Sequence, residues 1–211
     1  MERQPRVSVI IVDTYGQRSP EWMAARAGNP GASSISKIIT NSGEVSKQRA
    51  DYLYQLAGEK ITGKCEEGFQ SQAILTGIER EDAARSLFEM IYSVEVRQVA
   101  LVFKDEFKLF HCSPDGLVGE NAILELKNPM LKTHVRYLLD GKLPSDYFGQ
   151  CQMSLYVTER ELCYFMSCYE GMPPLILEVR RDERFISLLA KALSDFAADL
   201  ILTVRRLEAL R

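Results

Sequence analysis

Short apolar runs predict strands along much of the chain. In residues 122–127, AILELK, apolar and charged residues alternate, so that Ile123, Glu125 and Lys127 share one strand face while Leu124 and Leu126 share the other. Further extended runs lie at residues 7–13, 94–103, 106–112, 161–169 and 175–180. The turn at residues 104–105 indicates an antiparallel pair, and EGMPP at residues 170–174 indicates another.

Helical periodicity fills most of the remaining chain. Ser19-Pro20-Glu21 is typical of a helix start, and Ser33 or Ser34 is expected to cap a second helix that runs through Ile39. Amphipathic patterns predict further helices at residues 46–62, 70–90, 144–158 and 182–210, and a helix or irregular connector at residues 130–140. Strands that alternate with helices favour an α/β fold.

One acidic residue falls on the apolar face of the helix predicted at residues 70–90. Glu81 lies in the same stripe as Ile74, Ile78, Ala84 and Phe88. A buried carboxylate needs a partner or a metal. Arg85, one turn later, is the simpler partner, and a metal ion is the alternative.

Composition narrows the class of protein. The chain has 211 residues, 46% of them hydrophobic, without repeats or linkers, which predicts one domain over residues 1–211. No apolar run reaches the ~18 residues of a membrane span, and the polar start MERQPRV lacks the apolar region of a signal peptide. Five cysteines without CxxC spacing indicate reduced thiols of a cytoplasmic protein.

Charge and metal-binding residues exclude two further classes. With only two histidines, a structural zinc site is not expected. The net charge of −3 disfavours a general nucleic-acid coat, so any DNA contact must come from local basic patches.

The most informative stretch is SPDGLVGENAILELKNP, residues 113–129. Asp115 follows an extended run, Gly116 is expected to allow a tight turn, and nine residues separate Asp115 from Glu125. Two carboxylates offer hard oxygen ligands for Mg²⁺ or Mn²⁺, with the Lys127 ammonium nearby. This P-D-x9-E-x-K pattern resembles the PD-(D/E)xK motif of metal-dependent phosphodiesterases. The alternative is a surface hairpin whose Glu125 and Lys127 form a solvated ion pair of little energetic value.

Two other polar groups are candidates for phosphate binding. The hydroxyls near Ser33, at a predicted helix start, could receive a phosphate or simply cap the helix. Gln152 and Tyr156 lie four residues apart on one predicted helix face, where they could hold a phosphate or form an ordinary polar edge.

Five segments in this order resemble the RecB-like nucleases and, more closely, the family of phage lambda exonuclease and the YqaJ viral recombinases. They are EWMAARAGNPGAS (21–33), TGIEREDAARSLFE (76–89), CSPDGLVGENAILELKNP (112–129), GQCQMSLYVT (149–158) and RRDERF (180–185). The resemblance implies a PD-(D/E)xK restriction-endonuclease-like α/β core, with a central mixed sheet flanked by helices. Residues 1–18 carry no signal of the family.

The resemblance also implies an activity: a Mg²⁺-dependent 5′→3′ exonuclease that digests one strand of double-stranded DNA and leaves 3′ overhangs for recombination by strand annealing. Asp115, Glu125, Glu81 and the backbone carbonyl of Leu126 would bind one or two Mg²⁺ ions, which Mn²⁺ could replace. Lys127 would sit beside the attacking water, with a role as general base ranked second. Carboxylates ~4 Å apart repel by roughly 4 kcal/mol per pair at an effective dielectric of about 20, so such a cluster needs cations.

The resemblance further implies a 5′-phosphate pocket and binding partners. Arg26, Ser33, Ser113 and Gln152 would form the pocket, with Tyr156 beside it. The stiff sequence Asn29-Pro30-Gly31 leaves the choice between Ser33 and Ser34 open. A homotrimeric ring around DNA, a single-strand annealing protein and a phage or prophage origin in a bacterial cytoplasm are also implied.

Two rival functions stay open at this point. One is a Mg²⁺-dependent endonuclease or DNA-repair nuclease on the same core, which would cut closed circles. The other is a catalytically silent subunit that binds DNA ends, for which loss of Asp115 would have no effect.

Overall fold

The computed structural model describes residues 8–66 and 80–210. Its strands are β1 (Ile10–Val12), β2 (Val96–Arg97), β3 (Leu101–Phe103), β4 (His111–Cys112), β5 (Gly116–Val118), β6 (Ala122–Lys127), β7 (Leu162–Ser167) and β8 (Leu175–Arg180). Its helices are α1 (Pro20–Arg26), the 3₁₀ helix η1 (Ala32–Lys37), α2 (Arg49–Thr62), α4 (Glu81–Tyr92), α5 (Leu131–Asp140), α6 (Ser145–Thr158) and α7 (Glu183–Glu208). None of the helices in these two stretches has the length and apolar character that crossing a bilayer requires.

The strands form two sheets. The larger sheet has the order β2-β5-β6-β7-β8, and the smaller has the order β1-β3-β4. Strands β6 and β7 are parallel, whereas the other neighbours in the larger sheet are antiparallel. The parallel pair is joined by the crossover through α5 and α6, as this connection requires. The larger sheet is therefore mixed, as the family resemblance implied.

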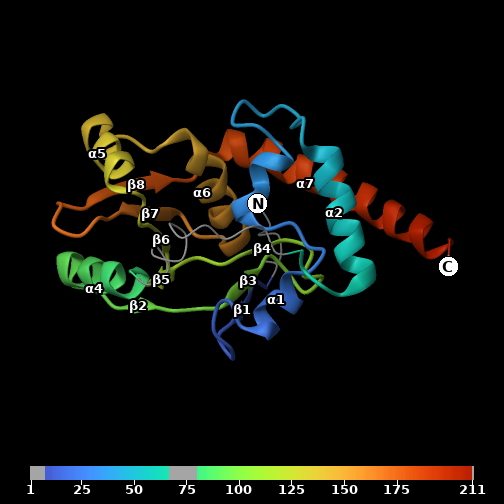
Figure 1. Cartoon of the computed structure of the whole chain (residues 1–211), viewed down its shortest axis with the longest axis horizontal. Coiled ribbons are helices and arrows are strands. Elements are labelled where there is room, and N and C mark those ends of the chain that lie inside the picture. Colours follow the sequence, from blue (N-terminus) through green and yellow to red (C-terminus); the bar gives the residue numbers. More distant parts are fainter. Residues whose placement is uncertain (1–7, 67–79, 211) are drawn as a thin grey trace, which may run out of the picture.

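Helices cover the larger sheet on both faces (Figure 1). Helices α2, α6 and α7 pack with Ile123 in the main core, and α4 packs through Phe88 against Leu124 and Leu126 on the opposite face. The alternating side chains of AILELK therefore pack into two separate apolar layers, one on each face of the sheet. Strand β6, in the middle of the sheet order, carries the predicted site between them. The predicted α/β architecture, a central mixed sheet flanked by helices, is confirmed.

Most predicted elements are present, with three differences. Residues 32–37 form a 3₁₀ helix that starts after Gly31 without a side-chain cap, so neither Ser33 nor Ser34 caps a helix. The run at residues 94–103 contributes to both sheets, because β2 pairs with β5 and β3 pairs with β4. The helix predicted at residues 70–90 is described from Glu81 to Tyr92, and residues 67–79 lie outside the described residues.

Gly116 serves close packing rather than a tight turn. Its φ is not positive, and a Cβ at this position would lie 2.0 Å from Cγ1 of Val96 on β2. The missing side chain lets β2 pair beside β5, immediately after Asp115.

Replacement of Gly116 by alanine should therefore destabilise the fold. The added methyl must displace β2, so Gly116→Ala is expected to lower the free energy of unfolding by about 1–3 kcal/mol. Urea unfolding of the two proteins would measure the change. Gly58→Ala is the matched control, since its Cβ meets nothing within 4 Å and helix α2 should gain up to about 1 kcal/mol. Equal stability of Gly116→Ala and the unaltered chain would contradict this account.

Candidate active site

Asp115 is held against β6 by backbone and side-chain hydrogen bonds. Its N–H donates to the Leu124 carbonyl at 3.0 Å, and its Oδ2 accepts the Leu126 N–H at 2.6 Å. Because β5 and β6 are antiparallel, the residue before β5 lies beside the end of β6. This pairing brings Asp115 next to Glu125 although nine residues separate them.

Glu125 is buried, with 2% of its surface exposed. Its Oε1 accepts hydrogen bonds from the Lys127 ammonium and from the Gln150 amide of α6. A solvated surface ion pair is therefore excluded for Glu125 and Lys127. The carboxylate is instead part of a buried polar cluster in which its charge is balanced by Lys127.

Glu81 reaches the same region from the first turn of α4. Its Oε1 accepts a hydrogen bond at 2.7 Å from Nη2 of Arg18, in the turn before α1. Arg85 is not its partner, because Arg85 pairs with Asp82 at 2.7 Å and donates from Nε to the Asp115 carbonyl at 3.1 Å. The contact of Arg85 with Asp115 ties α4 to the start of β5.

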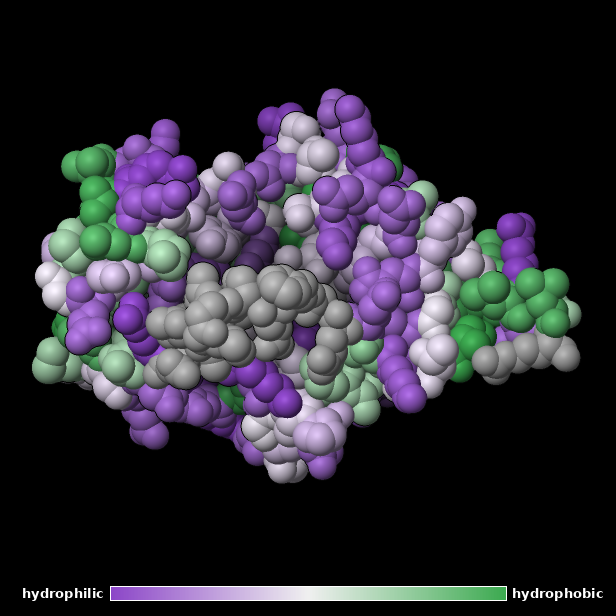
Figure 2. Space-filling model, viewed as in Figure 1, coloured by the Kyte–Doolittle hydropathy of each residue, from purple (hydrophilic) through white to green (hydrophobic). Residues whose placement is uncertain are grey.

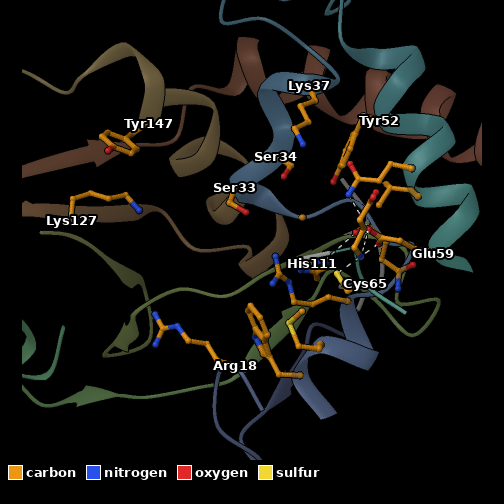
Figure 3. A pocket seen from close by; sticks show the side chains of 18 of the residues that line it. Arg18, Ser33, Ser34, Lys37, Tyr52, Glu59, Cys65, His111, Lys127 and Tyr147 are labelled. Carbon is orange, nitrogen blue, oxygen red and sulfur yellow. Dashed lines mark hydrogen bonds between the residues drawn. The ribbon is translucent and has the colours of Figure 1, made fainter. Parts of the chain in front are cut away.

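These groups line two cavities that share part of their walls. The smaller, about 200 Å³, is lined by residues that include Glu81, Asp115, Glu125, Leu126 and Lys127. The larger, about 1040 Å³, shares Glu81, Leu126 and Lys127 with it and extends to Lys37, Tyr52 and Tyr147. Figure 3 shows Arg18, Ser33 and Lys127 reaching into this space from three separate elements.

The carboxylates already have cationic partners within the protein. Arg18 pairs with Glu81, and Lys127 pairs with Glu125. In this arrangement, no group of three or more histidine, cysteine, aspartate or glutamate side chains within residues 8–66 and 80–210 is placed to hold a metal ion. The donor types nonetheless suit a hard divalent cation, since the three acidic residues Glu81, Asp115 and Glu125 line one cavity.

Protonation follows from the same burial and charges. Burial, with the Glu125 carboxylate second, raises the pKa of Asp115 to about 7, although Lys127 and the Leu126 N–H oppose this rise. Burial acts to lower the pKa of Lys127, but the carboxylates of Glu125 and Asp115 outweigh it and raise that pKa above its usual range. Lys127 is therefore a cation at neutral pH, which disfavours a neutral general base.

Arg26 places a guanidinium in the wall of the smaller cavity. Its guanidinium lies 3.8 Å over the Trp22 ring, and Trp22 in turn donates from Nε1 to Ser113 Oγ at 3.0 Å. Nε of Arg26 is buried without a hydrogen-bond partner among the described residues. Arg26, Ser33 and Ser113 all line the smaller cavity together with the carboxylates. An anion bound there would supply the missing partner.

His111 lines both cavities, as Arg26 does. Burial, with the charge of Arg26 second, lowers the pKa of His111 to about 3, so its ring is neutral. Its Nε2 lies 3.2 Å from the Asn29 carbonyl, and the buried Nδ1 has no partner among the described residues. A Cβ on Gly31 would lie 2.5 Å from Cε1 of His111, so only glycine fits there. Ser33 lines the smaller cavity and Ser34 does not, which favours Ser33 as the hydroxyl of that cavity.

Two predicted phosphate-binding residues lie elsewhere. Gln152 is buried and bridges α6 to the start of α7, donating to the Arg180 carbonyl at 2.9 Å and accepting the Asp182 N–H at 2.8 Å. The Lys104 ammonium lies 4.5 Å from the centroid of the Tyr156 ring. Tyr156 does not line either cavity. The structure thus does not bring this pair to the site.

Gln150 and Ser154 are the residues of α6 that line the smaller cavity. They have the same i, i+4 spacing as Gln152 and Tyr156, but on another helix face. Gln150, two positions before Gln152 in GQCQMSLY, was the residue in the sequence that could have indicated this helix face. No sequence signal singled out Arg18 or His111.

The raised pKa of Asp115 predicts a pH-dependent stability in the absence of divalent metal. A carboxyl whose folded pKa lies above its unfolded pKa binds more protons when folded, so stability falls as pH rises from about 4 to about 7. With a chelator at pH 8, Asp115→Asn should be more stable than the unaltered chain by about 1–3 kcal/mol. The advantage should shrink as pH falls through 7, measured by urea unfolding. Asp195→Asn, at an exposed ion pair, is the control, and the same pH trend in both variants would refute the assignment.

Comparison with known proteins places this geometry in a family. A family model described as the YqaJ-like viral recombinase domain matches residues 21–161, more than half of the chain. The chain is 26% identical over 185 residues to an uncharacterised protein of Acanthamoeba polyphaga mimivirus, covering 80% of this chain and about a third (32%) of that protein.

Solved structures agree. An alkaline exonuclease from Laribacter hongkongensis, solved alone and with dAMP, is 29% identical, with a TM-score of 0.82 over 90% of this chain and 97% of that one. A phage-related exonuclease from Haemophilus somnus shares the fold at 13% identity, with a TM-score of 0.66 over 87% of this chain and 96% of that one. The chain belongs to the family of YqaJ-like viral recombinase domains.

Proposed function

We propose that the protein is a Mg²⁺-dependent 5′→3′ exonuclease that digests one strand of double-stranded DNA from its 5′-phosphorylated end and leaves 3′ overhangs for single-strand annealing. The observation that carries the proposal is the shared cavity. Asp115, Glu125 and Lys127 line it together with Arg26, whose buried Nε has no hydrogen-bond partner among the described residues. Membership of the YqaJ-like family and the likeness to an alkaline exonuclease support a nuclease that acts on DNA.

The acidic groups would hold the metal. Asp115, Glu125, Glu81 and the Leu126 carbonyl would be its ligands. When bound, Mg²⁺ would supply a water of lowered pKa and would offset negative charge at the reacting phosphate. Gln150 keeps Glu125 oriented through its amide. Mn²⁺ should replace Mg²⁺, since both prefer oxygen ligands.

Lys127 acts as a cation in this proposal. Its raised pKa keeps the ammonium charged, so it donates hydrogen bonds to the attacking water or a phosphate oxygen and stabilises the charge that develops there. A lysine that is charged at rest does not accept the proton of the water.

Arg26, Ser33 and Ser113 would bind the terminal 5′-phosphate. A guanidinium suits a phosphate because its planar fork can donate two hydrogen bonds at once. Since this pocket and the carboxylates line one cavity, the scissile bond would lie at a fixed distance from the 5′ end, which gives the enzyme its polarity. The Laribacter hongkongensis enzyme was solved with dAMP, a nucleoside monophosphate.

Family resemblance also supports a homotrimeric ring, a single-strand annealing partner and a phage or prophage protein acting in the bacterial cytoplasm. Apolar side chains are exposed at both ends of the long axis (Figure 2). Met90, Ile91 and Leu139 are exposed on α4 and α5, and Ile201, Leu202 and Leu210 near the end of α7. These surfaces are available for contacts between subunits.

The function is tested on end-labelled linear duplexes and closed circles with Mg²⁺. The proposal expects stepwise release from the 5′ ends and intact circles. Asp115→Asn should lower the rate roughly a thousandfold or more, a loss of about 4 kcal/mol of transition-state stabilisation, while DNA binding persists. Cut circles would favour an endonuclease, and full activity of Asp115→Asn, or none in the unaltered chain, would favour a silent end-binding subunit.

The phosphate pocket predicts a preference for phosphorylated ends. Arg26→Ala should reduce the ratio of rates on 5′-phosphate and 5′-hydroxyl duplexes by about 10–100-fold, because a charge-assisted hydrogen bond is lost. Arg49→Ala is the matched control, since Arg49 pairs with Asp199 and lines neither cavity. If the unaltered protein used both ends equally, the pocket would have no role in polarity.

A further inference from the structure

Arg18 lies in a turn that is anchored on both sides. Gln17 donates from Nε2 to the carbonyls of Val99 and Pro114, each at 3.0 Å, which fixes the turn beside Asp115. Ser19 caps α1 by accepting the Trp22 N–H at 3.2 Å. The backbone of Arg18 therefore has little freedom to relax.

Between these anchors Arg18 adopts a φ of +68°, in the left-handed region that residues other than glycine, asparagine and aspartate seldom adopt. In this conformation its guanidinium reaches Glu81, 63 residues away, at 2.7 Å. The side chains of the pair are 42% and 21% exposed. Such an ion pair adds little stability, so the unusual backbone is not explained by folding energy.

We propose that Arg18 holds Glu81 while the site is free of metal, competes with the divalent cation for this carboxylate, and on release binds a phosphate of the DNA. The inference rests on the proposed nuclease function. It assigns a role to a residue that the sequence motifs did not include.

Charge balance leads to this role. Lys127 offsets Glu125, and Arg18 offsets Glu81, so two of the three carboxylates are neutralised by side chains. A divalent cation between the carboxylates would repel both positive groups. Lys127 stands on the same strand as Glu125, whereas Arg18 comes from a separate turn and is more exposed. Arg18 can therefore leave without any movement of the sheet.

The released guanidinium has a place to go. Arg18 lines both cavities, as do Glu81 and Arg26, the cation of the proposed phosphate pocket. A planar guanidinium can donate hydrogen bonds to two phosphate oxygens at once, whereas a lysine ammonium acts as a point charge. Metal binding would thus free a cation at the place where the DNA backbone arrives.

The competition is tested by Mn²⁺ titration of the full chain without DNA, by calorimetry at low salt. Arg18→Asn removes the charge while asparagine accepts the left-handed conformation. It should bind Mn²⁺ roughly tenfold more tightly than the unaltered chain, because a competing and repelling cation is gone. Arg80→Gln is the matched control, since Arg80 precedes Glu81 but faces Glu170 and Tyr169. It should change the affinity much less.

Each result of this titration has a defined meaning. Equal or weaker Mn²⁺ binding by Arg18→Asn overturns the competition while leaving the metal centre intact. An equal gain in Arg80→Gln also overturns it, because the effect is then one of net charge. If neither the unaltered chain nor Arg18→Asn binds Mn²⁺, the proposed metal centre fails, and the role of Arg18 fails with it.

The second half of the inference is tested with DNA at saturating Mn²⁺. With every variant loaded, Arg18→Asn should raise KM for the duplex several-fold, and Arg18→Lys should recover part of the loss by restoring a cation. An unchanged KM in Arg18→Asn overturns the transfer to phosphate.

Discussion

Repulsion between carboxylates is the constraint on which the site depends. Asp115, Glu125 and Glu81 line one cavity, and the pKa of Asp115 shows that burial and its acidic neighbours disfavour its charge. The fold meets this cost with cations and N–H groups drawn from several elements. Lys127, Arg18 and the Leu126 N–H each donate to one of the three carboxylates. The position of β6, with a helix layer on each face, makes this convergence possible.

The site is assembled from both sides of the sheet. Glu81 comes from α4 on one face, and Gln150 comes from α6 on the other. Arg26 and Ser33 come from α1 and η1, which precede the sheet in the chain. The residues that line the smaller cavity thus come from helices α1, η1, α4 and α6, from strands β4 and β6, and from the segments just before α1 and β5. A change in the packing of either layer would alter the distances between these residues.

Much of this arrangement could be predicted from the sequence because it follows from local periodicity. The alternation in residues 122–127 placed Glu125 and Lys127 on one strand face, and the spacing of Asp115 matched an antiparallel neighbour. Gln152 misled because two glutamines lie two residues apart on α6, and only packing decides which face meets the cavity. Arg18 could not be predicted, since its contact joins distant residues through an unusual φ. The requirement for Gly116 likewise depends on Val96, which no local pattern links to it.

The parallel pairing of β6 and β7 has a consequence for how the protein is made. Thirty-four residues between Lys127 and Leu162 must form the crossover before the two strands can pair, and closing a long loop precedes the contacts that reward it. During synthesis the acidic strand emerges well before the helix that carries Gln150. A nascent chain therefore contains Asp115 and Glu125 before Gln150 can contact Glu125. The site is complete only after α5 and α6 have packed and β7 has paired with β6.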